Sequence, residues 1–405
     1  MIINKTILLK CIIYFKGEDM RYIKSGKILL ITSMIASSAL YATNGDTLIG
    51  VGAKTRAMGG AGIALSQGAE STLVNPALIT KVKSNEISFG GTIFAPTIKT
   101  TFQGQEKKSS SDLSMIPAVA IASEIMPNIY AGIGMYGTAG MGVDFRGNPT
   151  HMDMETTLQL MQFAAPLAYK SGGLSVGIAP IVQYGSLDIN YKNYMAPGQP
   201  QVGYGQKQDF GFGVSLGAVY DFGNGFSVGA VYKSKIKMEY KKVLTTAANP
   251  LGVMVGDTLT QPAEYGIGFG YKMGAHSIAL DIKKIAWSKA TGYKTFNWQD
   301  QTVFAAGYEY NAGKWALRFG YNYAKNPIKN SQNPMINTFN LLGFPATAKS
   351  HFSVGGSYEF NKNFSMDATL VYAPSSKTSL NSNTPFAIAN KHSELGTTIQ
   401  FNYKF

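Results

Sequence analysis

Apolar and polar side chains alternate with a period of two along most of the chain after about residue 85. In the last stretch, HSELGTTIQFNYKF, Leu395, Ile399, Phe401 and Tyr403 fall on one face, and small or polar residues fall on the other. KWALRFGYNYA, HFSVGGSYEF and NFSMDATLVY alternate in the same way. Because successive side chains of a strand point to opposite faces, these segments predict β-strands with one apolar face.

The alternating segments are regularly spaced. We place fourteen strands at 85–100, 112–124, 128–138, 157–170, 173–193, 208–221, 225–240, 262–273, 275–286, 298–310, 314–324, 349–361, 363–374 and 392–405. Short turns alternate with loops of 11 to 24 residues between them. That asymmetry, with aromatic residues near strand ends, is typical of outer-membrane barrels. A soluble β-sandwich also alternates, but its strands are shorter.

The sequence therefore predicts an all-β fold, a 14-stranded antiparallel transmembrane β-barrel over residues 85–405. An even strand count places both ends of the barrel on the periplasmic side, with short periplasmic turns and long external loops. The final Phe405 closes an alternating strand, as expected of a signal for the outer-membrane assembly machinery.

The N-terminus has the pattern of an export signal. Residues 1–42 are predicted to be an N-terminal extension and signal peptide, with the true start at Met20 and cleavage near Ala42; Ala39 is the alternative site. Three basic residues precede an apolar stretch of 13 residues, which is shorter than the roughly 20 that a membrane-spanning helix needs. The only cysteine, Cys11, lies in this part, so no disulfide framework is expected.

Composition narrows the function classes. Charged residues make up 15% of the chain, against roughly 25% in soluble domains. The net charge is +13, but no Lys/Arg cluster with interleaved aromatic residues indicates nucleic-acid binding. The four histidines have no metal-ligand spacing, and the pairing of His351 with Ser353 on one face is weak evidence for a hydrolase. We therefore expect no enzyme, no metal and no cofactor.

Residues 43–84 are rich in glycine and alanine and do not alternate. GVGAKTRAMGGAGIALSQGAESTLVNPA lacks the Gly-Lys-Ser/Thr of a P-loop and the third glycine of the dinucleotide fingerprint. A barrel of this size leaks unless its lumen is obstructed, and glycine lets a segment pack closely against a wall. The segment is therefore predicted to be an N-terminal hatch, a plug in the lumen.

The ordered set of motifs resembles the FadL family of outer-membrane hydrophobic-compound transporters, which includes long-chain fatty acid and aromatic hydrocarbon transporters. MGGAGIA followed by NPA resembles the hatch of that family. PAVAIASE, MQFAAPLAYKSGGLSVGIAP, QPAEYGIGFGYKM, DIKKIAWSKA, FNWQDQTVFAAGYEY and WALRFGYNYAKNPI resemble its strands. The resemblance covers residues 43–405 and implies a 14-stranded barrel plugged by the hatch.

The resemblance also implies a transport route. A long-chain fatty acid or similar molecule is captured in an external groove and passes to an interior pocket. The hatch then rearranges, and exit is lateral, beside a kinked third strand near the Asn-Pro-Ala of the hatch. Carried over, the hatch and gating residues are Asn75, Pro76, Ala77, Gly132 and Gly134; the hatch sequence KTRAMGG adds Arg56. The two glycines are equally well explained as ordinary barrel residues, and Arg56 is better explained as pinning the plug to an acidic wall residue than as a ligand contact.

Two external segments suit hydrophobic capture. AGMGVDFRGNPTHMDMETTLQLM and NYMAPGQPQVGYGQ contain methionines, whose flexible side chains suit promiscuous binding. The candidate groove residues are Met141, Phe145, Met152, Met154, Leu158 and Met161, with Tyr194 and Met195 from the second segment. The alternative is that the methionines pack the loop's own core or face lipid.

Arg318 is the candidate cation for a ligand carboxylate. Its neighbours Leu317 and Phe319 belong to the lipid-facing set, so alternation turns Arg318 into the lumen. An interior arginine can bind a carboxylate bidentately, and the resemblance supports this position. The alternative is an ion pair with an inward-facing acid, such as Glu309 or Asp367. Lys233, Lys235 and Lys237 share one face of the seventh strand and are expected to line the lumen.

The sequence thus predicts hatch-gated passive uptake of long-chain fatty acids or similar hydrophobic compounds across the outer membrane of a Gram-negative bacterium. An aromatic hydrocarbon channel of the same family, a general porin and an adhesin are the alternatives. The expected partners are the hydrophobic small molecule, outer-membrane lipid and lipopolysaccharide, and the assembly machinery. The family implies a monomer.

Overall fold

The computed structural model describes residues 43–194 and 196–405. The predicted extension and signal peptide, with the start at Met20 and the cleavage site near Ala42, lie outside the described residues. The predicted groove residue Met195 lies outside them as well.

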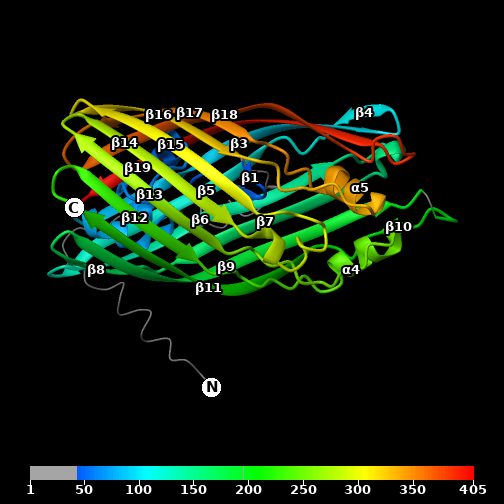
Figure 1. Cartoon of the computed structure of the whole chain (residues 1–405), viewed down its shortest axis with the longest axis horizontal. Coiled ribbons are helices and arrows are strands. Elements are labelled where there is room, and N and C mark those ends of the chain that lie inside the picture. Colours follow the sequence, from blue (N-terminus) through cyan, green and yellow to red (C-terminus); the bar gives the residue numbers. More distant parts are fainter. Residues whose placement is uncertain (1–42, 195) are drawn as a thin grey trace, which may run out of the picture. The chain divides into compact units, whose positions relative to one another are not determined.

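The described residues form a closed antiparallel barrel of fourteen strands (Figure 1). β7 and β8 form one strand interrupted at residues 165–166, since both pair with β9. The last strand pairs with the first along its length and closes the barrel. The strands are β3 (Glu86–Phe102), β5 (Ser114–Met126), β6 (Ile129–Asp144), β7 (Glu155–Ala164) with β8 (Leu167–Ser171), β9 (Leu174–Lys192), β11 (Lys207–Asp221), β12 (Phe226–Lys233), β13 (Glu264–Met273), β14 (His276–Ile285), β15 (Gln301–Asn311), β16 (Trp315–Ala324), β17 (Ser350–Glu359), β18 (Phe364–Leu380) and β19 (Ile388–Lys404). The predicted 14-stranded barrel is confirmed.

The two faces of the wall differ as the alternation requires. On β16, Leu317, Phe319 and Tyr321 are exposed on the outside, whereas Arg318 and Asn322 are buried on the inside. A lipid-facing surface must be apolar because it replaces water with hydrocarbon, and the inner face can carry polar groups that bond to one another. None of the described helices is long and apolar enough to cross a membrane.

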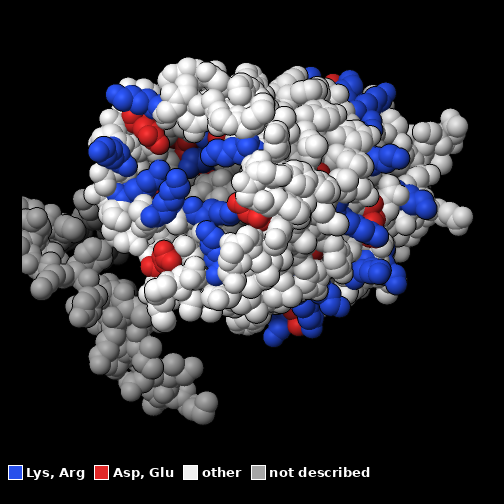
Figure 2. Space-filling model, turned by 60° about the vertical axis from the view of Figure 1, so that its left-hand side comes forward, with Lys and Arg blue, Asp and Glu red and all other residues white. Residues whose placement is uncertain are grey.

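The two ends of the barrel have different connections. At one end, called here the short-turn end, brief turns join neighbouring strands, and the barrel both begins and finishes there, at Glu86 and Lys404. Lysine and arginine side chains gather around a hollow at this end (Figure 2). The hollow has a volume of about 830 Å³ and is lined by Lys81, Lys83 and Lys272, among others.

At the opposite, long-loop end, the connections are longer and carry short helices and strands (Figure 1). They contain β4 (Gln105–Lys108), η4 (Pro149–His151), β10 (Gln201–Val202), α4 (Val243–Ala248), η5 (Asn249–Leu251), η6 (Trp287–Lys289) and α5 (Pro334–Gly343). α5 begins where its sequence favours it: Pro334 occupies the first turn, and the Asn333 side chain accepts a hydrogen bond from Met335 N. Its buried side includes Phe339, Leu341 and Leu342.

The seventh strand of the barrel, β12, is shorter than predicted. It ends at Lys233, and residues 234–240 turn inward with Ile236, Met238 and Tyr240 buried. Gly211 and Gly213 of β11 leave room for this turn, since a Cβ on either would overlap Ile236. Lys235 and Lys237 are exposed, so the expected row of three lysines along one strand face is wrong.

The N-terminal segment, residues 43–84, contacts the inner wall. It contains β1 (Thr43–Asn44), β2 (Thr47–Leu48), α3 (Ala53–Ala57), η2 (Gly68–Leu73) and η3 (Pro76–Lys81). Wall side chains hold its backbone: Asp281 accepts hydrogen bonds from Gly62 N at 2.8 Å and Ile63 N at 3.0 Å, and Gln400 Oε1 accepts one from Ala53 N at 2.8 Å. Wall glycines permit the approach, because a Cβ on Gly320 would overlap the backbone of Met58 and Gly59.

Candidate functional site

The wall is interrupted between β5 and β6. Their paired residues run from Met126 and Ile129 up to Ala118 and Tyr136. Beyond that pair the described residues form no further rungs between these strands, and a bulge shifts the register of β6 against β7 between Gly137 and Ala139. The extra residue turns β6 out of line with β5, as bulges commonly do. A gap in the hydrogen-bond ladder therefore opens on one side of the barrel.

The N-terminal segment covers this gap from inside. Thr47 of β2 pairs with Ala139 of β6, and Gly140 N donates to the Asp46 carbonyl at 2.9 Å. Toward the long-loop end the wall closes again, because Ser110 N donates to the Asp144 carbonyl at 2.9 Å. The edge of β6 that lacks a partner in the wall is thus bonded to the N-terminal segment.

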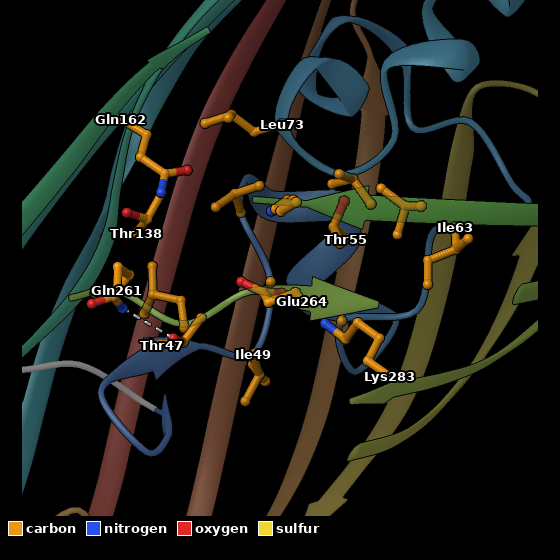
Figure 3. A pocket seen from close by; sticks show the side chains of 18 of the residues that line it. Thr47, Ile49, Thr55, Ile63, Leu73, Thr138, Gln162, Gln261, Glu264 and Lys283 are labelled. Atoms are coloured by element: carbon orange, nitrogen blue, oxygen red, sulfur yellow. Dashed lines mark hydrogen bonds between the residues drawn. The ribbon is translucent and has the colours of Figure 1, made fainter. Parts of the chain in front are cut away.

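An inner cavity of about 60 Å³ lies beside the covered gap (Figure 3). Thr138 and Gln162 line one side of it and Glu264 and Lys283 the other. Lys233 also lines it, and its cross-strand neighbour is Glu264. Among residues 43–194 and 196–405, neither lysine has an ion-pair partner within 4.0 Å. The inner cavity therefore carries more positive than negative charge.

An outer cavity of about 20 Å³ lies toward the long-loop end. Its lining comes from β6, β7, the α4 connection, the β14–β15 connection and α5. The lining residues are Met141, Leu158, Leu244, Leu259, Tyr293, Phe296, Trp298, Phe339, Asn340 and Phe344. Phe296 and Phe339 stack with ring centroids 5.1 Å apart. Aromatic and aliphatic walls of this kind suit an apolar guest.

Asp46 stands between the two cavities. Its carboxylate accepts hydrogen bonds from Tyr293 OH, which lines the outer cavity, and from Gln261 Nε2 at 2.9 Å, which lines the inner one. Burial raises the pKa of Asp46 to about 6, and these hydrogen bonds limit the rise. A buried acid therefore lies between the two cavities, held by one hydrogen bond from the lining of each.

The predicted groove residues are buried rather than arranged on an open surface. Phe145, Met152 and Met154 pack into the core of the long-loop end, each at most 3% exposed. This burial matches the alternative, in which these side chains pack the core of their own loop, and the external groove stays a prediction. Met141 and Leu158 do line the outer cavity, where a ligand role stays a prediction.

Met161 and Tyr194 have separate positions. β7 begins at Glu155, so alternation places Met161 on the outward face with the exposed Phe163, away from both cavities. Tyr194 OH donates to Asp153 Oδ2 at 2.7 Å, and Lys192 N donates to the Met152 carbonyl at 2.8 Å. The two predicted capture loops therefore do meet.

The predicted gating residues fall into two groups with different neighbours. Asn75 and Pro76 approach Gly217 of β11, and Pro76 and Ala77 approach Gly177 of β9, so these three residues contact a wall other than the kinked strand. Thr72 of η2 approaches Gly132 and Gly134 instead. The Asn75 side chain fixes the turn by accepting from Ala77 N and donating to the Ile63 carbonyl. Their role in gating stays a prediction.

Arg56 is buried in α3 without an acidic partner at close range. Its Nη1 donates to the Gly50 carbonyl at 3.4 Å, and no ion pair within 4.0 Å is found for it in the described part of the chain. Burial lowers the pKa of its guanidinium to about 10, opposed by the charge of Glu394. The expected direct pin is therefore missing, because Glu394 instead contacts His351 and His392.

Arg318 points into the lumen as alternation requires, near the short-turn end. Its Nε contacts Glu309 Oε2 at 2.6 Å, Nη1 contacts Ser357 Oγ at 2.5 Å, and Asp367 lies 3.7 Å away. These contacts match the ion-pair interpretation, and a ligand role stays a prediction.

We expect Arg318→Ala to lower the free energy of unfolding by about 3 kcal/mol, because it leaves the partly buried Glu309 without a cation and leaves the buried Asp367 with Lys54 alone, at 3.7 Å. Arg146→Ala is the matched control: its ion pair with Asp144 is exposed, so the loss should stay below about 1 kcal/mol. Urea unfolding in lipid vesicles measures both. Equal losses would contradict a buried ion pair, and a loss of oleate affinity in Arg318→Ala alone would support ligand binding.

A model of the family described as "Outer membrane protein transport protein (OMPP1/FadL/TodX)" matches residues 28–405. The chain belongs to this family. It is therefore an outer-membrane transport protein for hydrophobic compounds in a Gram-negative bacterium, and not an enzyme. Among the described residues, no cluster of His, Cys, Asp and Glu could hold a metal ion.

Several solved structures have the same fold as this chain. The chain is similar to a FadL homologue of Pseudomonas aeruginosa at 15% identity and a TM-score of 0.71, covering 89% of this chain and 100% of that one. It is similar to the toluene transporter TodX of Pseudomonas putida at 18% identity and a TM-score of 0.68, covering 90% of this chain and 100% of that one. It is also similar to the toluene transporter TbuX of Ralstonia pickettii at 19% identity and a TM-score of 0.64, covering 88% of this chain and 98% of that one. No match was found among curated proteins.

Proposed function

We propose that the protein takes up long-chain fatty acids or similar amphiphiles by passive diffusion, with residues 43–84 as the hatch and the gap between β5 and β6 as the lateral exit. The observation that carries this proposal is the interrupted wall beside the inner cavity, bonded from inside by β2. Backbone groups that face hydrocarbon need hydrogen-bond partners, so an open gap is unstable. The hatch must therefore return and bond the free edge of β6 after each exit. The long-loop end then faces outward and the short-turn end faces the periplasm.

The charge of the inner cavity supports an acidic substrate. Lys233 and Lys283 line it with Glu264 as the nearby acid, which leaves a surplus of one positive charge. A carboxylate entering from the apolar outer cavity would find a cation there. The second candidate is an aromatic hydrocarbon, favoured by the aromatic lining of the outer cavity and by the likeness to toluene transporters.

Uptake in cells that lack their own transporter tests the function. Labelled oleate and labelled toluene are supplied separately, to cells with the wild-type chain and with Asn75→Ala/Pro76→Ala in the hatch. Oleate uptake that changes with the hatch variant would support the proposal. Toluene uptake alone would move the substrate to hydrocarbons, and neither, with open ion conductance in bilayers, would favour a porin.

Replacing both inner lysines should separate the two substrates. We expect Lys233→Met/Lys283→Met to lower oleate uptake about tenfold, because a carboxylate loses its charged partners, and to leave toluene uptake unchanged. Lys235→Met, an exposed position in the same region, is the control. An equal fall for both substrates would mean that the variant damages the path rather than recognition of the acid.

A further inference from the structure

Four lysines form a row across the outer face of the wall near the long-loop end, where β4 lies (Figure 1). Lys377 of β18 is the strand partner of Lys391 of β19. Lys391 is also the partner of Lys99 of β3, and Lys99 is the partner of Lys108 of β4. All four side chains are exposed. We call these four residues the lysine row.

The lysine row is unfavourable for the sheet by itself. Directly opposed side chains lie about 5 Å apart, and like charges in that position destabilise a sheet. Among the strand pairs of the described residues, no other rung joins two lysines. The row crosses four strands, which is about 14 Å at roughly 4.8 Å between neighbours. An anion bound along this length would relieve the repulsion.

Two acids neutralise only part of the row. Lys391 Nζ contacts Glu106 Oε2 at 2.8 Å, and Lys108 Nζ contacts Asp112 Oδ2 at 2.9 Å. Both ion pairs are exposed, so solvent weakens them. Lys99 and Lys377 have no ion-pair partner within 4.0 Å in the part of the chain that the structure describes. Four lysines against two acids leave a surplus of two positive charges.

The row lies just beyond the apolar band of the same strands. Toward the short-turn end, the next outward pair is Ser393 with Thr97, and Leu395 with Tyr372 follows it. From Leu395 to Lys391 is about 13 Å along the strand, or about 10 Å along the membrane normal at a strand tilt of roughly 40°. The polar headgroups begin at the edge of the hydrocarbon core and extend roughly 5–8 Å from it. Lysine side chains that bend toward the apolar band reach this layer.

We propose that the lysine row binds the phosphates of lipopolysaccharide, the phosphorylated glycolipid of the outer leaflet. The proposed orientation turns the long-loop end outward, so the row meets that leaflet. A lysine ammonium binds phosphate as a point charge, without the fixed geometry that arginine demands. The hydroxyls of Ser393 and Thr97 lie on the apolar side of the row, where the sugars of the glycolipid can bond to them. The inference uses the orientation of the barrel and not the transport route.

Binding of labelled lipid A, the phosphorylated anchor of lipopolysaccharide, to the purified full chain in neutral detergent tests the site. We expect Lys99→Gln/Lys377→Gln to weaken binding about thirtyfold, since each lysine near an anionic headgroup contributes about fivefold. Without lipid, the variant should be at least as heat-stable as wild type, because it removes repulsion between like charges. A less stable variant with weaker binding would show that the lysines support the sheet, and would overturn the inference.

Lys241→Gln/Lys329→Gln is the matched control. Both lysines are exposed in long-loop connections, outside the lysine row, and the change in net charge is the same. This variant should bind lipid A as wild type does. An equal loss of affinity in the control would mean that net charge alone attracts the lipid, and would overturn the site. Wild-type affinity in Lys99→Gln/Lys377→Gln would overturn it as well.

Glu106→Gln should act in the opposite direction. It frees Lys391 from its acid, so we expect lipid A to bind about fivefold more tightly, a gain that misfolding cannot produce. Glu239→Gln is its control, because it removes an exposed acid beside Lys237, away from the row. Unchanged or weaker binding by Glu106→Gln would contradict a phosphate site that includes Lys391.

The chemistry of the lipid separates the possible ligands. Dephosphorylated lipid A should bind wild type no better than it binds Lys99→Gln/Lys377→Gln. Phosphatidylglycerol that binds as tightly as lipid A, with the same dependence on the row, would show a general anionic-lipid surface and overturn the assignment to the glycolipid. Uptake is measured separately, so failure of the lipid A site leaves the proposed transport function standing, and failed uptake leaves the lipid A site standing.

Discussion

Uptake should stop when β2 is joined to β6 by a disulfide. Thr47 and Ala139 are antiparallel partners across the gap, and Cα atoms of such partners lie about 4.5 to 5.5 Å apart. That spacing is within the range that a disulfide bridges. With Thr47→Cys and Ala139→Cys oxidised, β2 cannot leave the edge of β6, so we expect uptake of labelled substrate to fall at least about tenfold and to recover with reductant.

A disulfide in the permanent wall is the control for this experiment. Thr92 and Thr398 are partners between β3 and β19, at the seam that closes the barrel. Thr92→Cys/Thr398→Cys should be oxidised equally well and transport normally. Wild-type uptake by the oxidised Thr47/Ala139 pair would show that substrate leaves without moving β2, and would refute the lateral exit at this gap.

The wall was predictable because every strand meets the same two environments. Because lipid lies outside the wall and packed polar side chains lie inside it, the side chains of each strand alternate with a period of two. This period correctly predicted all fourteen strands and the inward direction of Arg318. The same rule failed for KSKIKMEY after β12, which alternates as regularly as a strand. There Ile236, Met238 and Tyr240 are buried, and the alternate residues Lys235, Lys237 and Glu239 are exposed. Alternation shows that the two faces of a segment have different environments, but it does not show that one of these environments is lipid.

The bulge in β6 could not be predicted from alternation either. Tyr136 and Ala139 both lie on the inner face, although three positions separate them, because the register shifts between Gly137 and Ala139. The resemblance pointed to Gly132 and Gly134 of this strand, and their role in gating stays a prediction. The ladder itself ends only at Tyr136, where it loses β5 as a partner.

The site that joins the N-terminal segment, the two cavities and the gap comes from residues far apart in sequence. Asp46, Gln261 and Tyr293 meet across separations of 215 and 247 positions, and no local pattern connects them. A compositional signal did exist: two of the three tryptophans of the chain lie in the single segment WSKATGYKTFNW. Aromatic residues concentrated in one loop are expected to pack together, and here they form the surface on which Gly45, between β1 and β2, packs.

A large side chain at Gly320 should release the N-terminal segment from the wall. Its Cβ would overlap the backbone of Met58 and Gly59, and the contacts around this point are specific. Asn322 Nδ2 donates to the Gly59 carbonyl at 2.9 Å, and Gly59 N donates to Ser353 Oγ at 3.1 Å. Shifting the segment leaves these buried groups without partners, at about 1–3 kcal/mol each.

We therefore expect Gly320→Leu to accelerate hydrogen exchange of the amides in α3 and residues 59–63 at least about a hundredfold, since exchange follows the free energy of local opening. Gly356→Leu on β17 is the control, because residue 356 alternates onto the outer face with Val354 and Tyr358, where a leucine meets lipid. Exchange protection in Gly320→Leu equal to that of the control, in a folded barrel, would contradict close packing against β16. Faster exchange confined to this segment would show that it can move while the wall stays intact, which the proposed lateral exit requires.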